Sequence, residues 1–419
     1  MKKFTVSILG AGSRGVDTYG SFMQECGDRF QIVALCDIDP KKLERAKKIF
    51  SATNISCFTE EDVFFEKRRS DVLIIATPDK EHVRQALKAM PLGYSILLEK
   101  PISADYGECL KLAEAQKKYG NFIMVCHVLR YTASVRKIKE VLDSGVLGKI
   151  VSIDHLERVA YWHFAHSYVR GNWHKEADSA PSILAKCCHD LDLMQYYAGC
   201  RCTALSSVGG LDWFKAENRP EGAAARCLDC KYADSCEYSA KRIYLRWAEN
   251  ENFRDLWPYN TITAEPLSEE SILKALRQTD YGKCVYACGN DVADNQHVVM
   301  EFENGIRAYL TMMAFTYDGG RRTSVYGTKG ELFFDESKNS LKIALFNDRI
   351  TEYKLTDLEK DMRGHGGGDN NMIRTLYGKL CSPNTENQTD LEHSIESHKL
   401  AHYAEISRKA GGARIDLPK

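Results

Sequence analysis

The chain has 419 residues and a formal net charge of −1, which gives it no general attraction to nucleic acid or to an anionic membrane. A chain of this length is longer than one ordinary hydrophobic core can organise, which predicts two domains. No apolar run reaches the roughly 18 residues of a membrane-spanning helix, and the first residues are typical of a strand rather than a signal peptide. We therefore expect a cytoplasmic protein whose fifteen cysteines are reduced thiols or metal ligands.

Apolar runs alternate with helical patterns in the first part of the chain. Strands are predicted at residues 6–9, 31–36, 71–76, 94–98 and 122–126. Their near-continuous apolar character is typical of parallel strands that are buried on both faces. A helix is predicted at residues 103–119, with Ser103 as its N-cap. Residues 1–125 are therefore predicted to form a Rossmann domain, which is a doubly wound parallel sheet.

A glycine-rich loop follows the first predicted strand. Its residues are Gly10, Gly12, Ser13, Arg14 and Gly15. The glycines let the backbone turn and approach a pyrophosphate, and the helix that follows offers free N–H groups to that anion. The second strand is followed by Asp37, whose carboxylate can accept hydrogen bonds from an adenosine ribose. Strand, glycine loop, helix and acid together predict a dinucleotide-binding site.

Asp37 also favours NAD over NADP, because its carboxylate repels the 2′-phosphate of NADP. The next residue, Ile38, cannot bind a phosphate. Lys41 and Lys42 could do so, but their place directly after Pro40 is typical of the solvated start of a helix. NAD is therefore the predicted cofactor.

The second part of the chain has the pattern of an antiparallel sheet. Hairpins are predicted for residues 298–302 with 306–315, 323–326 with 331–334, and 341–346 with 350–355. Helices are predicted at residues 135–142 and 390–409, and residues from about 209 to 290 show no clear period, which is typical of an insertion over a site or an oligomer contact. Residues 126–419 are therefore predicted to form a second α/β domain with an open, largely antiparallel sheet.

Several short motifs combine into one pattern. They are the glycine loop with Asp37, Ala76-Thr77-Pro78 with His82, Glu99-Lys100-Pro101, and Cys188-His189-Asp190-Leu191-Asp192. In these motifs the chain resembles the Gfo/Idh/MocA family, named after glucose–fructose oxidoreductase, inositol dehydrogenase and a rhizopine-catabolism protein. The resemblance covers nearly the whole chain. It implies a nicotinamide-dependent oxidoreductase of sugars, polyols or their derivatives, and a homo-oligomer, dimer or tetramer, that is joined through the open sheet.

The resemblance implies that Lys100 and His189 carry the reaction. Lys100 follows a predicted parallel strand, at the sheet edge where ligands bind, and a histidine suits removal of a hydroxyl proton near neutral pH. The cofactor site is completed by Thr77, Pro78, His82, Glu99 and Lys100. The family's usual aspartate four residues before the histidine is replaced by Ala185. Lys186 would share a helix face with His189 and is the third predicted catalytic residue; a solvent-facing Lys186 is the alternative.

A segment rich in aromatic and basic residues is predicted to bind the substrate. Its candidate residues are Tyr161, His163, His166, Arg170 and Trp173. Aromatic rings pack on the apolar face of a sugar, and basic groups bind its hydroxyls or an acid group; a buried aromatic strand edge is the alternative. His365 is a further candidate, because it lies in a glycine-rich segment before a helix whose N-cap Asp369 fits.

The predicted insertion contains a cysteine motif. Cys227, Cys230 and Cys236 have the spacing C-x2-C-x5-C, which fits three corners of a tetrahedral zinc site. Cys284 or Cys288 could supply the fourth ligand, and free thiols are the alternative. A zinc ion here would be structural, because nothing in the sequence places it near the nicotinamide.

Three functions fit this sequence. They are net NAD-dependent oxidation of a carbohydrate, a redox-neutral cleavage by transient oxidation and elimination, and a non-catalytic NAD sensor. Lys100, Lys186, His163, His166 and Arg170 are expected to converge on the reacting carbon. That much positive charge favours a substrate with an acidic group, because an anion would offset it.

Overall fold

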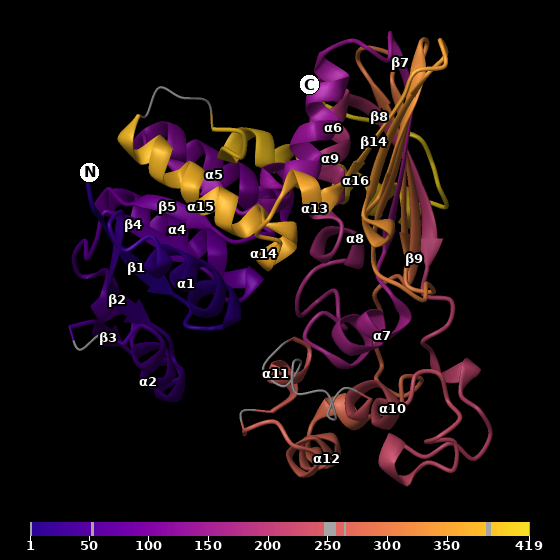
Figure 1. The fold of residues 1–419 in the computed structure, drawn as a ribbon. Helices are drawn as coiled ribbons and strands as arrows, with labels where there is room; N and C mark the ends of the chain where they lie inside the picture. The colour runs from indigo at the N-terminus through magenta and orange to yellow at the C-terminus, as the bar shows by residue number, and fades with distance from the viewer. Residues whose placement is uncertain (1, 52–53, 247–256, 264, 383–386, 419) are drawn as a thin grey trace.

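The computed structural model of the chain describes residues 2–51, 54–246, 257–263, 265–382 and 387–418. Residues 247–256 and 264 of the predicted insertion lie outside the described residues. The described part forms two sheets with their helices, one in each half of the molecule (Figure 1). Within it, no helix combines the length and apolar character needed to cross a lipid bilayer.

The first half contains a parallel sheet of six strands in the order β3-β2-β1-β4-β5-β6. This is the doubly wound order, so the prediction of a Rossmann sheet is confirmed. The strand order reverses between β1 and β4, and ligands of such sheets bind in the crevice at that point. The strands are β1 Phe4–Leu9, β2 Phe30–Cys36, β3 Ser56–Phe58, β4 Val72–Ile75, β5 Ser95–Leu98 and β6 Ile123–Val125.

Short helices connect these strands. They are α1 Ser21–Glu25, α2 Pro40–Ile49, α3 Glu61–Phe65, α4 His82–Ala89 and α5 Tyr106–Tyr119, and a π-helical segment, Ser13–Gly20, precedes α1. Pro40 occupies the first position of α2, as predicted. The predicted N-cap Ser103 is wrong, because Asp105 caps α5 by accepting a hydrogen bond from the N–H of Glu108 at 3.2 Å. The Ser103 hydroxyl instead accepts a hydrogen bond from the N–H of Asp105.

The second half contains a nine-stranded sheet in the order β14-β13-β12-β11-β7-β10-β9-β8-β15. Only β7 and β10 pair in parallel within this sheet, which confirms the prediction of an open, largely antiparallel sheet and its three hairpins. The strands are β7 Ile150–Arg158, β8 Cys202–Gly210, β9 Asn295–Phe302, β10 Arg307–Met313, β11 Gly320–Gly327, β12 Gly330–Asp335, β13 Ser340–Leu345, β14 Ile350–Lys354 and β15 Ile415–Asp416.

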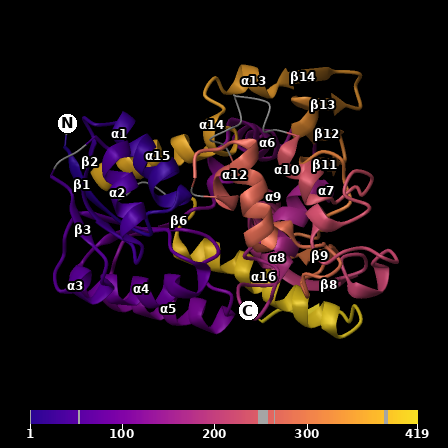
Figure 2. The same ribbon diagram turned by 90° about the horizontal axis from the view of Figure 1, so that it is seen from below.

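Helices cover one face of this second sheet, between it and the first half (Figure 1). The helices of this half are α6 Ala133–Asp143, α7 Tyr161–Phe164, α8 Ser182–Ala185, α9 Cys188–Ala198, α13 Leu355–Leu358, α14 Arg363–Gly366 and α16 Leu391–Lys409, whereas α15 Gly368–Cys381 packs against the first half. The other face is open and exposes Val208, Val299 and Tyr309. Between β8 and β9 lies the insertion, with α10 Ala240–Leu245, α11 Tyr259–Ile262 and α12 Glu269–Gln278. Figure 2 views the molecule from the side of this insertion.

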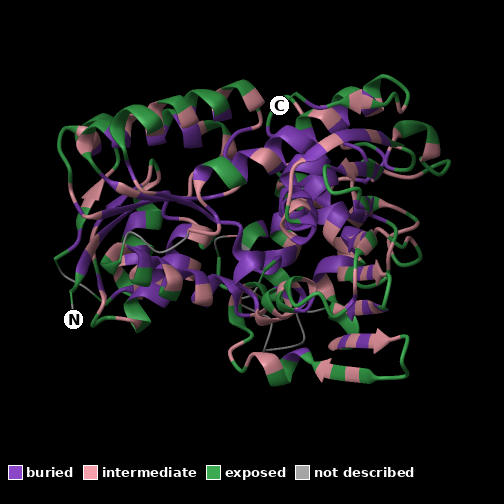
Figure 3. Cartoon of the chain, turned by 90° about the horizontal axis from the view of Figure 1, so that it is seen from above, coloured by how far each residue is buried: buried purple, intermediate pink, exposed green. Residues whose placement is uncertain are grey.

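Two C-terminal helices return to the first half. Met372, Ile373 and Leu376 of α15 join the apolar core that β1 and β2 form with the helices on one face of the parallel sheet. Leu391 and Ile395 of α16 join the core on the opposite face. Figure 3 shows buried residues along the strands of the parallel sheet and where the two halves meet.

Candidate functional site

The glycine loop after β1 is tight at its ends and open in its middle. Gly10 has φ +95°, and a Cβ there would lie 2.4 Å from the carbonyl oxygen of Ala76. A Cβ at Gly15 would lie 2.2 Å from the carbonyl oxygen of Gly10, whereas one at Gly12 would meet no atom within 4 Å. The open space at Gly12 faces no other side chain, and the helical segment Ser13–Gly20 starts directly after it. This geometry fits a pyrophosphate held by backbone N–H groups.

Asp37 lies at the end of β2, beside this loop. One carboxylate oxygen accepts a hydrogen bond from the N–H of Ala11 at 2.8 Å, and the other accepts one from the N–H of Asp39 at 2.9 Å. The side chain of Ile38 is fully outside the core, at 89% exposure. These bonds fix the carboxylate at the sheet edge, where the ribose of a dinucleotide lies in doubly wound folds.

Arg14 and Glu99, both predicted to bind the cofactor, bind each other. The Arg14 Nε donates to Glu99 at 2.6 Å, and a second nitrogen donates to Asp369 at 2.7 Å. Tyr19 also donates to Glu99, at 2.6 Å. Burial alone would raise the pKa of Glu99, but the charges of Arg14 and Lys100 outweigh it and lower the pKa. Glu99 is therefore an ionised carboxylate that joins the glycine loop to Lys100.

His82 joins the two loops that carry the other predicted cofactor residues. Its ring nitrogens lie 2.8 Å from the carbonyl oxygen of Pro101 and 2.9 Å from that of Thr77. The Thr77 hydroxyl donates to Gln85 at 2.6 Å. Thr77 and Pro78 follow β4, so these contacts hold the loops after β4 and β5 together at the ligand-binding edge.

Lys100 and His189 come from different halves and meet at this edge. The Nζ of Lys100 lies 3.5 Å from the carbonyl oxygen of Ala185, next to the start of α9. His189 is buried, and burial together with the nearby charge of Lys100 lowers its pKa well below the usual value. The Nδ1 of His189 has no hydrogen-bond partner among the described residues. His189 is therefore a neutral imidazole with a free ring nitrogen.

Lys186 does not share a helix with His189, because α8 ends at Ala185 and α9 begins at Cys188. Its Nζ lies 3.1 Å from a carboxylate oxygen of Glu157, at the end of β7. Arg321 lies 3.2 Å from the other oxygen of Glu157 and donates to Asp190 at 2.7 Å. Two buried carboxylates therefore balance Lys186 and Arg321, and the expected excess of positive charge is not found.

The aromatic segment divides into two groups. Burial, and then the charge of nearby Lys186, lower the pKa of His163 well below its usual value. The indole of Trp173 donates to Asp79 of the first half at 3.4 Å, so this residue faces the loop after β4. Tyr161 lies further out, where its ring stacks on that of Tyr317 with centroids 6.4 Å apart.

His166 and Arg170 hold the insertion in place. The Nδ1 of His166 lies 2.7 Å from the hydroxyl of Tyr244, and its ring stacks on Tyr281. Arg170 donates to the carbonyl oxygens of Lys283 and Tyr238 at 2.8 and 2.7 Å. Both side chains are buried, so the expected convergence of these two groups on the reacting carbon is not found.

The structure does not support the predicted zinc site. Among the described residues, no three His, Cys, Asp or Glu side chains are grouped so that they could hold a metal ion. The Cys227 thiol lies 3.7 Å from the carbonyl oxygen of Lys283, and the Cys288 thiol donates to that of Cys284 at 3.2 Å. Burial raises the pKa of Cys236, of Cys284 and, to about 11, of Cys288, which favours neutral thiols over the thiolates that zinc binds. Cys230 is also a free thiol.

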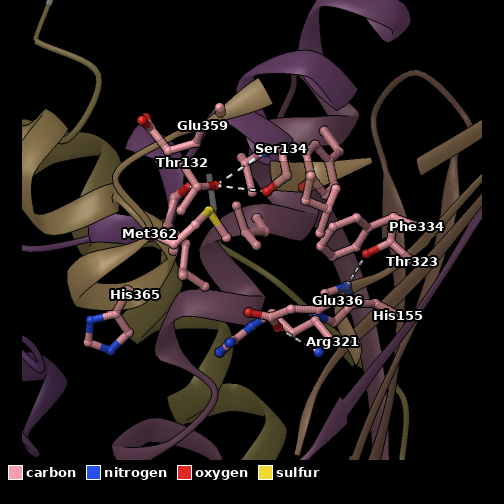
Figure 4. Close-up of a pocket in the computed structure, with 17 residues that line it drawn as sticks. Thr132, Ser134, His155, Arg321, Thr323, Phe334, Glu336, Glu359, Met362 and His365 are labelled. Atoms are coloured by element: carbon pink, nitrogen blue, oxygen red, sulfur yellow. Dashed lines mark hydrogen bonds between the residues drawn. The ribbon is translucent and has the colours of Figure 1, made fainter. Parts of the chain in front are cut away.

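His365 lies beside a small cavity of about 40 Å³, which is lined by residues of the second half. Arg321, Glu336, Glu359 and Met362 also line it, and Figure 4 shows their side chains around it. The predicted N-cap role of Asp369 is wrong, because Gly367 occupies the N-cap position of α15. The Asp369 carboxylate instead contacts the Nδ1 of His365 at 2.9 Å.

The comparisons with known proteins agree with this geometry. The profile of the oxidoreductase family with an NAD-binding Rossmann fold matches residues 4–127, and that of the family's C-terminal alpha/beta domain matches residues 139–413. The chain belongs to the Gfo/Idh/MocA oxidoreductase family. Its first half is therefore an NAD-binding Rossmann unit.

Individual Gfo/Idh/MocA proteins resemble it at low identity. The oxidoreductase YteT of Bacillus subtilis is 24% identical over 390 residues, covering 89% of this chain and 88% of YteT. The 2,7-anhydro-N-acetylneuraminate hydratase of Mediterraneibacter gnavus is 27% identical, covering 50% of this chain and 53% of the hydratase. The WlbA dehydrogenase of Bordetella pertussis, solved with NADH and UDP-GlcNAcA, has a TM-score of 0.66 at 17% identity, and all of both chains is covered.

Within the Gfo/Idh/MocA fold, sequence reasoning missed the site roles of four residues. Glu157 and Arg321 complete the ion network around Lys186, and they come from β7 and β11. His127 packs edge-on against His189, with ring centroids 5.6 Å apart. Asp369 has the sequence context of a helix cap alone, yet it contacts His365. Of these four residues, only His127 could have been found from the sequence, because it directly follows the predicted strand at residues 122–126.

Proposed function

We propose that this protein oxidises a hydroxyl-bearing carbon of a sugar, polyol or related derivative with NAD. The observation that carries the proposal is the pair formed by Lys100 and buried, neutral His189 at the ligand-binding edge of the parallel sheet. Bound NAD supplies the hydride acceptor. His189 accepts the proton of the reacting hydroxyl, and the ammonium of Lys100 stabilises the developing alkoxide.

The cofactor is assigned to the loop at the crevice between β1 and β4. Gly10, Gly12, Ser13 and Gly15 would hold the pyrophosphate, and Asp37 would bind the ribose diol, which selects NAD over NADP. Thr77, Pro78 and His82 would border the nicotinamide end of the site. Arg14 and Glu99 are paired with each other, so we assign them a structural role beside the cofactor instead of a direct charge contact with it.

The substrate class rests on relatives and on the aromatic side chains. Several relatives are named for carbohydrate-like substrates, including the hydratase above and an inositol 2-dehydrogenase that is 24% identical over 191 residues. We assign His163, Trp173, Lys186 and His365 to the substrate site, and Tyr161 to its outer part; in support, His365 packs 6.2 Å from His189 and Trp173 donates to Asp79 of the first half. His166 and Arg170 would support the site through the insertion. The open face of the second sheet is the proposed homo-oligomer contact, and the cytoplasm remains the proposed location.

A redox-neutral reaction is the second candidate. It is favoured by the His365–Asp369 pair near His189, because transient oxidation followed by elimination needs more than one acid–base group. The hydratase relative acts on an anhydro sugar by name, which supports the same candidate. The two candidates share the hydride step and differ in the fate of the oxidised substrate.

A substrate panel tests the proposal. Purified protein is incubated with NAD and either myo-inositol, D-glucose, D-glucuronate or the p-nitrophenyl glycosides of glucose and glucuronic acid. NADH absorbance reports net oxidation, and p-nitrophenol release without net NADH reports redox-neutral cleavage. Neutral and acidic members appear together because Glu157 and Asp190 already balance Lys186 and Arg321. Equal activity of wild type and His189→Gln would contradict the assignment of the base.

A further inference from the structure

His365 is held in an unusual backbone conformation. Four successive residues, from Gly364 to Gly367, have positive φ, and His365 itself has φ +46°. A non-glycine residue in this left-handed region is strained and is rare outside constrained sites. A Cβ at Gly364 would lie 2.5 Å from a carboxylate oxygen of Asp369, so glycine is needed there for the turn to close on that carboxylate. The turn fixes where the His365 ring lies.

The contact with Asp369 orients the imidazole. The His365 Nδ1 lies 2.9 Å from one carboxylate oxygen, and Arg14 donates to the other at 2.7 Å. Burial would raise the pKa of Asp369, but Arg14 and His365 outweigh it and hold the pKa well below its usual value. An ionised carboxylate at Nδ1 fixes the ring and stabilises the imidazolium that forms when Nε2 takes a proton. No described residue forms a hydrogen bond with Nε2, which is therefore available.

The ring stands close to the proposed reaction centre and to solvent. Its centroid is 6.2 Å from that of His189, and both rings lie where the two halves meet. The side chain of His365 is 42% exposed, whereas the carboxylate of Asp369 is fully buried. Only a small cavity of about 40 Å³ adjoins His365 (Figure 4), so a substrate would reach the ring from its solvent-exposed side. Two histidines at this separation can reach two neighbouring positions of one sugar ring.

We infer that His365 is a second acid–base residue, which removes the proton from the substrate carbon next to the one that is oxidised. The inference rests on the proposed function, because that carbon becomes acidic only when its neighbour is a ketone. In the step, the C–H bond breaks, its proton goes to Nε2 of His365, and its electron pair forms an enolate whose oxygen lies near Lys100. The reverse step returns a solvent proton to carbon, so the exchange itself is neither an oxidation nor a reduction.

Deuterium exchange tests this role apart from the hydride step. Wild type is incubated in D₂O with NAD and the panel member that yields NADH, beginning with myo-inositol. NADH formation is followed by absorbance, and deuterium on carbon of the recovered substrate and ketone is measured by mass spectrometry. Reactions without enzyme correct for spontaneous exchange. The wild type should place deuterium next to the oxidised carbon.

The decisive variant is His365→Gln, which keeps a donor for Asp369 but cannot exchange a proton. We expect its carbon exchange to fall about 10²-fold further than its NADH formation, as for loss of a general base, while NAD binding stays close to wild type. The matched control is His393→Gln, because His393 forms a similar pair with Asp390 at 2.9 Å on the surface. His365→Asn is the second variant if the glutamine protein is unstable.

Each outcome has one meaning. A loss of exchange that exceeds the loss of NADH formation by about 10²-fold supports the role of His365. Equal loss of both, or retention of both, overturns it, since a structural residue would affect both steps alike. Exchange that is absent in wild type although NADH forms also overturns it. A wild type that neither forms NADH nor releases p-nitrophenol with any panel member overturns the proposed function itself and this inference with it.

Discussion

Replacement of Asp37 by alanine is the sharpest test of the cofactor assignment. A carboxylate offers about four acceptor positions, and the structure uses two of them for the N–H groups of Ala11 and Asp39. Two positions remain for the two ribose hydroxyls, and a hydrogen bond to a charged group is worth about 1.5–3 kcal/mol. Loss of both bonds, about 3–6 kcal/mol, should therefore weaken NAD by roughly 10²–10⁴-fold in Kd, at 1.4 kcal/mol for each tenfold. NADP should weaken less, because the repulsion of its 2′-phosphate is also removed.

Titration calorimetry with NAD and NADP, on wild type and variant, measures all four dissociation constants. Asp39→Ala is the matched control, because Asp39 caps α2 by accepting from the N–H of Lys41 at 2.9 Å in the same loop. Its loss should cost about 0.5–2 kcal/mol of stability and leave the NAD affinity nearly unchanged. If both variants weaken NAD equally, the effect of Asp37 is on the loop and not on the ribose. Tighter NADP than NAD binding by wild type would refute the assignment outright.

Substitutions and pH test three other properties of the site and its core. Lys100→Met and His189→Gln should each lower turnover about 10²–10⁴-fold with little change in the Kd for NAD; full turnover in either variant contradicts its role. Glu157→Gln should lower the free energy of unfolding by about 3–5 kcal/mol, because it deprives Lys186 and Arg321 of a carboxylate. Lys186→Met should lower it less, since Glu157 keeps Arg321 as a partner. Equal urea midpoints of these two variants would disprove the pairing. Burial lowers the pKa of His166 and of His398 to about 3. As the pH falls below about 6.5, these histidines take up protons in the unfolded state before they do so in the folded state. Each of them should therefore lower the free energy of unfolding by up to about 1.4 kcal/mol per pH unit. Urea midpoints that stay constant between about pH 7 and pH 5 would contradict this.

The elements that could be predicted from the sequence depend on local patterns. The buried parallel strands show as apolar runs, and Asn304-Gly305 is a local turn signal between two alternating strands, so both sheets could be assigned before their partners were known. The glycine loop was also predictable, because its spacing directly after an apolar strand is a local pattern. The structure shows why glycine is needed there, since a Cβ at Gly10 or Gly15 would collide with the backbone of Ala76 or of Gly10.

The site residues that were missed depend on contacts between distant segments. Lys186 lies 29 positions after Glu157, and nothing in either local sequence shows that β7 places that carboxylate 3.1 Å from the lysine. Arg170 and His166 have the residue types of a binding site, yet both are buried and form hydrogen bonds with partners in the insertion. Asp369 has the residue type of a helix cap, but the left-handed turn before it supplies His365 as a closer partner. Residue type alone therefore identifies candidate site residues. The tertiary contacts are needed to distinguish those that can bind a ligand from those that hold the fold.

The return of α15 and α16 to the first half means that the cofactor-binding unit is not a continuous piece of chain. Its apolar core includes Met372, Ile373 and Leu376 on one face and Leu391 and Ile395 on the other. A polypeptide that ends after β6 would leave the surfaces under both helices open to water, so we do not expect the N-terminal 125 residues to fold independently. During synthesis, the two apolar cores of the parallel sheet can be completed only after the last fifty residues, which include most of α15 and all of α16, have been made. A truncation near the C-terminus should therefore damage NAD binding at the opposite end of the sequence.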